Sequence, residues 1–157
     1  MGGGGSGGSR NVGDISALSE AARAALSRER RNVFISFAYE DIDEVNLLRG
    51  QSKNELSDVA FNDWSVSEPY ESKNADYIKN RISERISQSS VTVVYLSSST
   101  ANSKWVGWEV ERSRELNKAV VAVHAGANPP ASMPVWVRDY GIKVTSWANL
   151  PETLRRM

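Results

Sequence analysis

The residues of this sequence that are best suited to chemistry lie in one short segment, Ser103-Lys104-Trp105-Val106-Gly107-Trp108-Glu109. The spacing predicts a helix on which Trp105, Trp108 and Glu109 lie on one side. A carboxylate among indole rings is partly desolvated, which is typical of functional groups. The alternative interpretation is that both tryptophans anchor the helix to a core and that Glu109 is a solvated helix residue.

Few other side chains offer nucleophilic or metal chemistry. The chain has no cysteine, which excludes disulfides, thiolate zinc sites and cysteine nucleophiles. Its one histidine, His124, ends an apolar run and is interpreted as structural. We therefore expect no metal site.

Charge and hydropathy argue against two further classes of partner, nucleic acids and membranes. The 19 basic and 19 acidic side chains balance, so nothing favours a nucleic acid or an anionic membrane. No apolar run approaches the roughly 20 residues of a membrane span, and no signal-peptide pattern follows Met1. These features predict a cytoplasmic protein without nucleic-acid or membrane partners.

Alternating elements must position the segment around Glu109. Short β-branched and aromatic runs predict buried strands at 32–37, 58–61, 91–96, 120–123 and 142–145. Helical patterns fall around Val45–Leu56, around Ile78, Ile82 and Ile86, and over 103–118 and 150–157. Strands that alternate with helices predict an α/β fold, with a five-stranded parallel sheet and helices on both faces.

The N-terminal region differs in composition from the rest of the chain. Met1–Ser9 holds six of the eleven glycines, and residues 1–13 are interpreted as a flexible linker or tag. Asp14 is a good N-cap, so residues 14–31 are predicted to form an extra N-terminal helix ahead of a main domain at 32–157.

Sites in parallel sheets lie at the carboxyl ends of the strands, near the point where strand order reverses. Here those ends precede Phe37–Asp41, Asn62–Ser65, Ser97–Thr100 and the residues after His124. The helix that carries Glu109 begins just after Ser97–Thr100, so its first turns should overhang this edge.

Three common nucleotide or phosphate chemistries do not fit. The sequence has neither a P-loop nor a Gly-x-Gly-x-x-Gly turn after the first strand. A phospho-receiver domain needs a carboxylate at the end of the third strand, where this chain has Ser97. A nucleotide-binding domain with another hydrolase activity stays open.

Two motifs together resemble a known family. Val33–Asp41 resembles the opening strand of TIR domains, and Ser103–Glu109 resembles their S-x-W-x-x-x-E segment. More narrowly, Val91–Glu109 is similar to the TIR-like domain of the bacterial Thoeris antiphage system. The resemblance covers about Asn32 to Trp147, with Val106 where the common motif has a cysteine. It implies a three-layer, flavodoxin-like fold.

The resemblance also implies an activity. TIR-like enzymes hydrolyse or cyclise NAD at the nicotinamide–ribose bond, and in Thoeris the cyclic ADP-ribose product activates a separate effector. NAD would be the substrate, no cofactor would be needed, and Glu109 would be catalytic. The expected substrate-binding residues are Phe37, Ala38, Tyr39, Asp63, Ser97, Trp105 and Trp108.

The chemistry of NAD suits a site with one carboxylate. Ordinary glycoside hydrolysis uses two, because the departing alkoxide must be protonated. Nicotinamide leaves as a neutral molecule, so a single glutamate can stabilise the oxocarbenium-like transition state. The alternative is a non-enzymatic TIR-type scaffold that acts by self-association, with the Asp63–Asn74 loop as its contact surface.

Overall fold

The computed structural model describes residues 31–62 and 68–157. The predicted linker, residues 14–30 of the predicted N-terminal helix, and Asp63 lie outside these described residues. The chain divides into two units between Arg31 and Asn32, and the second unit, to Met157, carries the sheet.

The sheet of the second unit has five strands in the order β2-β1-β3-β4-β5. The strands are β1 (Arg31–Ser36), β2 (Val59–Asn62), β3 (Val91–Leu96), β4 (Ala119–His124) and β5 (Lys143–Ser146). Parallel pairing aligns Val33 with Val91, Val91 with Ala119, and Val121 with Lys143. This strand order is flavodoxin-like and reverses between β1 and β3, so it confirms the predicted α/β fold.

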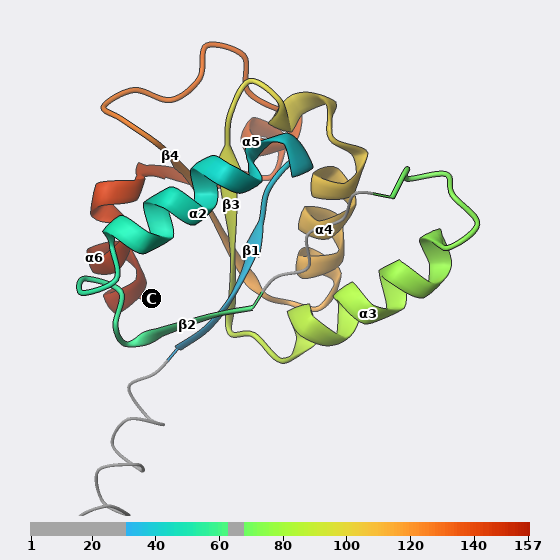
Figure 1. Ribbon diagram of the computed structural model, residues 1–157, viewed down its shortest axis with the longest axis horizontal. Helices are drawn as coiled ribbons and strands as arrows, with labels where there is room; N and C mark the ends of the chain where they lie inside the picture. The colour runs from blue at the N-terminus through green and yellow to red at the C-terminus, as the bar shows by residue number, and fades with distance from the viewer. Residues whose placement is uncertain (1–30, 63–67) are drawn as a thin grey trace, which may run out of the picture. The chain divides into compact units, whose positions relative to one another are not determined.

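Helices cover both faces of this sheet (Figure 1). One face carries α2 (Ile42–Gln51) and α6 (Leu150–Arg155), and the other carries α3 (Ala75–Ser87), α4 (Lys104–Glu115) and α5 (Val135–Asp139). Within the described residues, no helix is both long and apolar enough to cross a bilayer.

Residue parity decides which layer each strand residue enters, because successive side chains of a strand point to opposite faces. Odd-numbered residues of the central strands pack on the α2 and α6 side: Val33, Ile35, Val91, Val93, Tyr95, Val121 and Val123. Even-numbered residues pack on the α3, α4 and α5 side: Phe34, Val94, Leu96 and Ala122. This alternation also governs the polar residues at the strand ends.

The three largest differences from the predicted elements concern helices. Helix α2 ends at Gln51, before Leu56, and α4 ends at Glu115, where Asn117 takes a left-handed conformation with φ 60°. The sequence places no helix in the proline-containing segment before β5, but Pro134 caps the short α5. Proline fits at this N-cap position because the N–H of an N-cap residue has no partner within the helix.

Candidate functional site

Glu109 is buried beneath the carboxyl edge of the sheet, at the reversal in strand order. Its side chain is 3% exposed, and the Ser36 hydroxyl donates a hydrogen bond of 2.5 Å to Oε1. Ser36 is the last residue of β1 and has even parity, so it faces α4. The interpretation of Glu109 as a solvated helix residue is therefore wrong.

The sequence of α4 explains how Glu109 comes to face the sheet. Ser103 caps the helix, because its Oγ accepts a hydrogen bond of 3.2 Å from the Val106 N–H. From there, a buried stripe with helical spacing runs through Val106, Glu109, Val110 and Ser113. The Ser113 hydroxyl lies 2.8 Å from that of Thr92 on β3, which ties the helix to the sheet one turn beyond Glu109.

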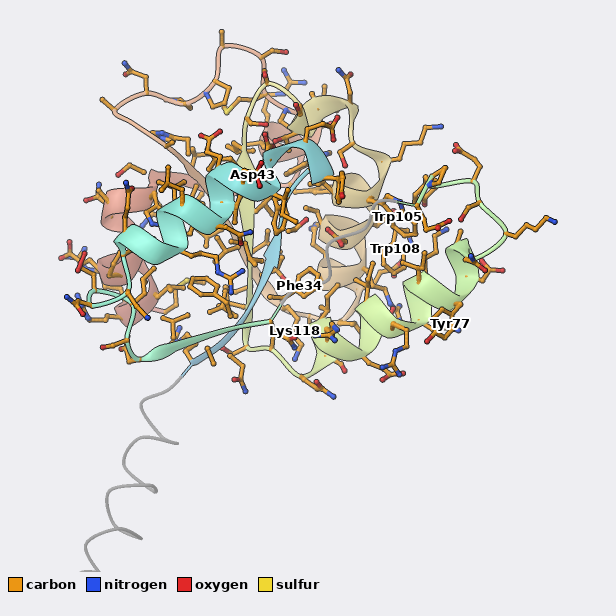
Figure 2. All side chains as sticks on the ribbon, viewed as in Figure 1. Phe34, Asp43, Tyr77, Trp105, Trp108 and Lys118 are labelled. Carbon is orange, nitrogen blue, oxygen red and sulfur yellow. The ribbon has the colours of Figure 1, made fainter. Side chains whose placement is uncertain are left out.

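The two tryptophans flank this stripe and point toward α3 (Figure 2). Both are half-buried and pack on a cluster of Phe34, Ile78, Ile82 and Ile86. Their rings meet edge-on with centroids 6.3 Å apart. The proposed anchoring role of the tryptophans therefore agrees with the structure, alongside any role at the site.

A cavity of about 390 Å³ opens beside Glu109, a volume typical of small-molecule sites. Of the residues expected at the site, four line this cavity: Phe37, Tyr39, Trp105 and Glu109. The other lining residues are Glu40, Glu68, Pro69, Tyr70, Glu71, Asn102, Ser103 and Lys104.

Residues 68–71, which we call the cavity wall, are held against α4 by three contacts. The Trp105 indole N–H donates to the Glu68 carbonyl at 2.8 Å, and the Tyr70 ring meets Trp105 edge-on at 5.0 Å. Lys104 Nζ lies 2.5 Å from Glu71 Oε1. The hydrogen bond and charge of Lys104 lower the pKa of Glu71, and those of Glu71 raise the pKa of Lys104.

The lining combines aromatic rings with negative charge. Phe37, Tyr39, Tyr70 and Trp105 supply rings, while glutamates supply the acidic groups. Among the described lining residues Lys104 is the one cation, and it is paired with Glu71. Such a lining suits a flat, positively charged ring. Among residues 31–62 and 68–157, no group of three or more histidine and carboxylate side chains is placed to hold a metal ion.

The structure does not bring Ser97, Ala38 or Trp108 to this cavity lining. Ser97 has odd parity, so its hydroxyl points to the opposite layer and donates to Asp41 Oδ2 at 2.5 Å. Ala38 is buried and caps the short helix η1 (Tyr39–Asp41). Trp108 packs toward α3, with Lys79 Nζ 5.7 Å from its ring.

On the Asp41 side of the sheet, burial shifts the pKa values of two acidic groups, Asp41 and Tyr95. Burial raises the pKa of the Asp41 carboxyl, partly opposed by the hydrogen bond from Ser97 and reinforced by Glu44 and Glu40. Burial and the hydrogen bond to Glu44 raise the pKa of the Tyr95 phenol well above its ordinary value. His124 is buried at the end of β4 and lies outside the lining of the Glu109 cavity.

Sequence reasoning missed Ser36, and it considered residues 68–71 only as part of the Asp63–Asn74 contact loop, not as a wall of the site. Strand parity could have found Ser36, since it lies two residues beyond the buried Phe34 on the same side of β1. No local pattern marks Glu68 or Tyr70, because they reach the site through the packing of a loop on Trp105.

A family model described as "Thoeris protein ThsB, TIR-like domain" matches residues 34–129. A Bacillus cereus protein named "Putative cyclic ADP-D-ribose synthase ThsB1" is 30% identical over 101 residues, which are 62% of this chain and 53% of that protein. A Cytobacillus dafuensis protein named "Putative cyclic ADP-D-ribose synthase TIR2" is 26% identical over 120 residues, 75% of this chain and 31% of that protein. The chain thus spans about half and about a third of these relatives.

A solved structure supports the same fold. A Clostridium botulinum CMP N-glycosidase, BcmB, aligns with a TM-score of 0.50 and 11% identity over 81% of this chain and all of that one. The TIR domains of the activated Roq1 resistosome align with a TM-score of 0.47 and 20% identity over 78% of this chain and 69% of that one. At 11% identity, the alignment with the N-glycosidase is evidence for the fold alone.

Proposed function

This chain belongs to the TIR-like family of the Thoeris protein ThsB, and we propose that it cleaves NAD at the nicotinamide–ribose bond, with Glu109 as its catalytic residue. The observation that carries the proposal is a buried carboxylate that borders a cavity at the strand-order reversal of the sheet. Both relatives carry the name "Putative cyclic ADP-D-ribose synthase", which supports the same bond as the target.

The cavity lining suits the reacting half of NAD. The nicotinamide ring of NAD is a flat cation, and the lining offers the aromatic rings of Phe37, Tyr39 and Trp105 together with carboxylates. The leaving group departs as neutral nicotinamide, so no side chain has to protonate it. One carboxylate is therefore enough for the departure step.

Glu109 would act on the sugar. As the glycosidic bond breaks, positive charge develops on the ribose, and a fixed carboxylate beside it stabilises that charge. Burial strengthens this effect, because the interaction takes place in a medium of low dielectric constant. Hydrogen bonds from the ribose hydroxyls to Glu109 would strengthen as that charge develops, so they would act mainly in the transition state.

The fate of the ribosyl cation decides the product. Attack by water gives ADP-ribose, whereas attack by a group of the same nucleotide in a dry site gives a cyclic product. In either case, the product would be an ADP-ribose-type nucleotide that signals to a separate effector in antiphage defence. We also propose that TIR–TIR contacts assemble several copies of the chain.

The test is incubation of the purified chain with NAD, at high protein concentration and with a phage lysate as trigger. Nicotinamide release and the nucleotide products are followed by mass spectrometry. Glu109→Gln is compared with Glu111→Gln, which neutralises an exposed glutamate on the same helix. We expect release from the wild type and from Glu111→Gln and almost none from Glu109→Gln.

Equal nicotinamide release from the wild type and Glu109→Gln would overturn the proposal. A wild-type chain that is inert toward NAD under every trigger but assembles as its concentration rises would instead support the scaffold interpretation.

A further inference from the structure

The hydroxyl of Ser36 is a fixed hydrogen-bond donor to the carboxylate of Glu109. The donor and acceptor atoms lie 2.5 Å apart, and the two side chains are 1% and 3% exposed. A donor to an ionised carboxylate makes a stronger hydrogen bond than a neutral pair does. The contact joins β1 to α4 beneath the cavity.

The backbone around Ser36 gives the donor little freedom. Ser36 pairs with Val94 of β3 in the centre of the sheet, and the three residues before it, Val33–Ile35, are buried. Ser36 does not line the cavity, whereas Glu109 does. Any effect of Ser36 on a ligand in the cavity must therefore pass through Glu109.

We propose that Ser36 is a positioning residue for the reaction, an inference that rests on the proposed function. By holding Oε1 from below, Ser36 fixes the plane of the Glu109 carboxylate relative to the ribose. A carboxylate that has to find its orientation during the reaction stabilises the transition state less than a preorganised one. The effect belongs to the chemical step, because the residues expected to bind the nicotinamide ring lie elsewhere in the lining.

A purely structural role for Ser36 predicts a different outcome, and the chain contains a matched control for it. Ser113 also joins α4 to the sheet: its hydroxyl lies 2.8 Å from that of Thr92 and donates to the Glu109 backbone carbonyl at 2.7 Å. Ser113→Ala therefore removes a buried contact between the same helix and the neighbouring strand β3 but leaves the Glu109 carboxylate with its donor.

The experiment measures kcat, KM and melting temperature with NAD for the wild type, Ser36→Ala, Ser36→Thr, Ser113→Ala and Glu109→Gln. For Ser36→Ala we expect kcat to fall about 10- to 100-fold, the range for loss of a hydrogen bond to a charged group, with KM unchanged. Ser36→Thr restores the hydroxyl and should recover most of kcat. Ser113→Ala should lower the melting temperature and keep kcat.

Ser36→Cys guards against a folding defect in the other variants, because it keeps the side chain's approximate size and offers only a weak donor. It should lose kcat as Ser36→Ala does. The inference is overturned if Ser36→Ala keeps the wild-type kcat, if the loss appears in KM, or if Ser113→Ala loses kcat equally.

These results separate the two proposals. A wild type no faster than Glu109→Gln overturns the proposed function, and the role of Ser36 falls with it. A wild type that is faster than Glu109→Gln, together with an unimpaired Ser36→Ala, overturns the role of Ser36 alone.

Discussion

Replacing Trp105 with alanine should loosen the cavity wall at residues 68–71. The indole N–H donates to the Glu68 carbonyl at 2.8 Å, and the ring meets Tyr70 edge-on at 5.0 Å. A neutral hydrogen bond contributes about 1 kcal/mol and an edge-on aromatic pair contributes about as much again. The local opening free energy of the wall should therefore fall by about 2 kcal/mol.

Hydrogen exchange measures this opening directly, because exchange of a protected amide follows the population of its open state. The Ser72 N–H, which donates to the Pro69 carbonyl at 3.0 Å, is the reporter amide. A loss of about 2 kcal/mol corresponds to about 30-fold faster exchange in Trp105→Ala. Trp105→Phe keeps a ring but loses the donor, so about fivefold is expected.

Lys104→Ala is the matched control in the same helical turn. Its ion pair with Glu71 is exposed at both ends, with side chains 68% and 67% accessible, so its loss should leave exchange in the wall unchanged. Amides of β3 should be unaffected in all three variants. Wild-type exchange of the wall in Trp105→Ala would refute the reasoning, and so would a large increase in Lys104→Ala.

Three further predictions concern stability. Ile82→Ala empties a fully buried position between α3 and the sheet and should lower the free energy of unfolding in urea by about 2–4 kcal/mol, whereas a loss below about 1 kcal/mol would contradict the packing. Gly107→Ala lies within α4, where an added Cβ meets only Trp136 Nε1 at 3.9 Å, so thermal unfolding should show a gain of about 0.5–1 kcal/mol. Asp41→Asn should stabilise the chain at neutral pH, since burial raises the pKa of this carboxyl in the folded state. The folded wild type then binds the proton more tightly than the unfolded chain, so its stability rises as pH falls through the folded pKa. The advantage of Asp41→Asn should accordingly shrink toward about pH 4, and melting temperatures across this range would show a constant difference if the reasoning is wrong.

Much of the fold follows from local patterns in the sequence. The apolar run Val91–Leu96 and the fourfold spacing of Ile78, Ile82 and Ile86 predict elements that tertiary packing only has to join. The short α5 is harder, because the nearby prolines suggest a loop and the helix has only five residues. Val137 of this helix is buried against the sheet, and no local sequence pattern predicts that contact.

The site was predictable where one element carries its residues. Trp105 and Glu109 share α4, and Phe37 and Tyr39 follow β1 directly, so their meeting at one edge follows from strand order. Ser97 directly follows β3 at the expected edge, but its hydroxyl donates to Asp41 and it does not line the Glu109 cavity. The cavity wall depends on a loop whose course is set by contacts with α4.

The pleat of β1 also limits how this gene can change. A loop at the sheet's edge can gain or lose a residue and adjust its backbone. A single inserted residue near the start of β1 would instead place every later side chain of the strand on the other face of the sheet. Ser36 would then turn away from α4, and Phe34 would leave its place against α3. We expect length variation among functional variants to spare this strand and to accumulate in the connections around it.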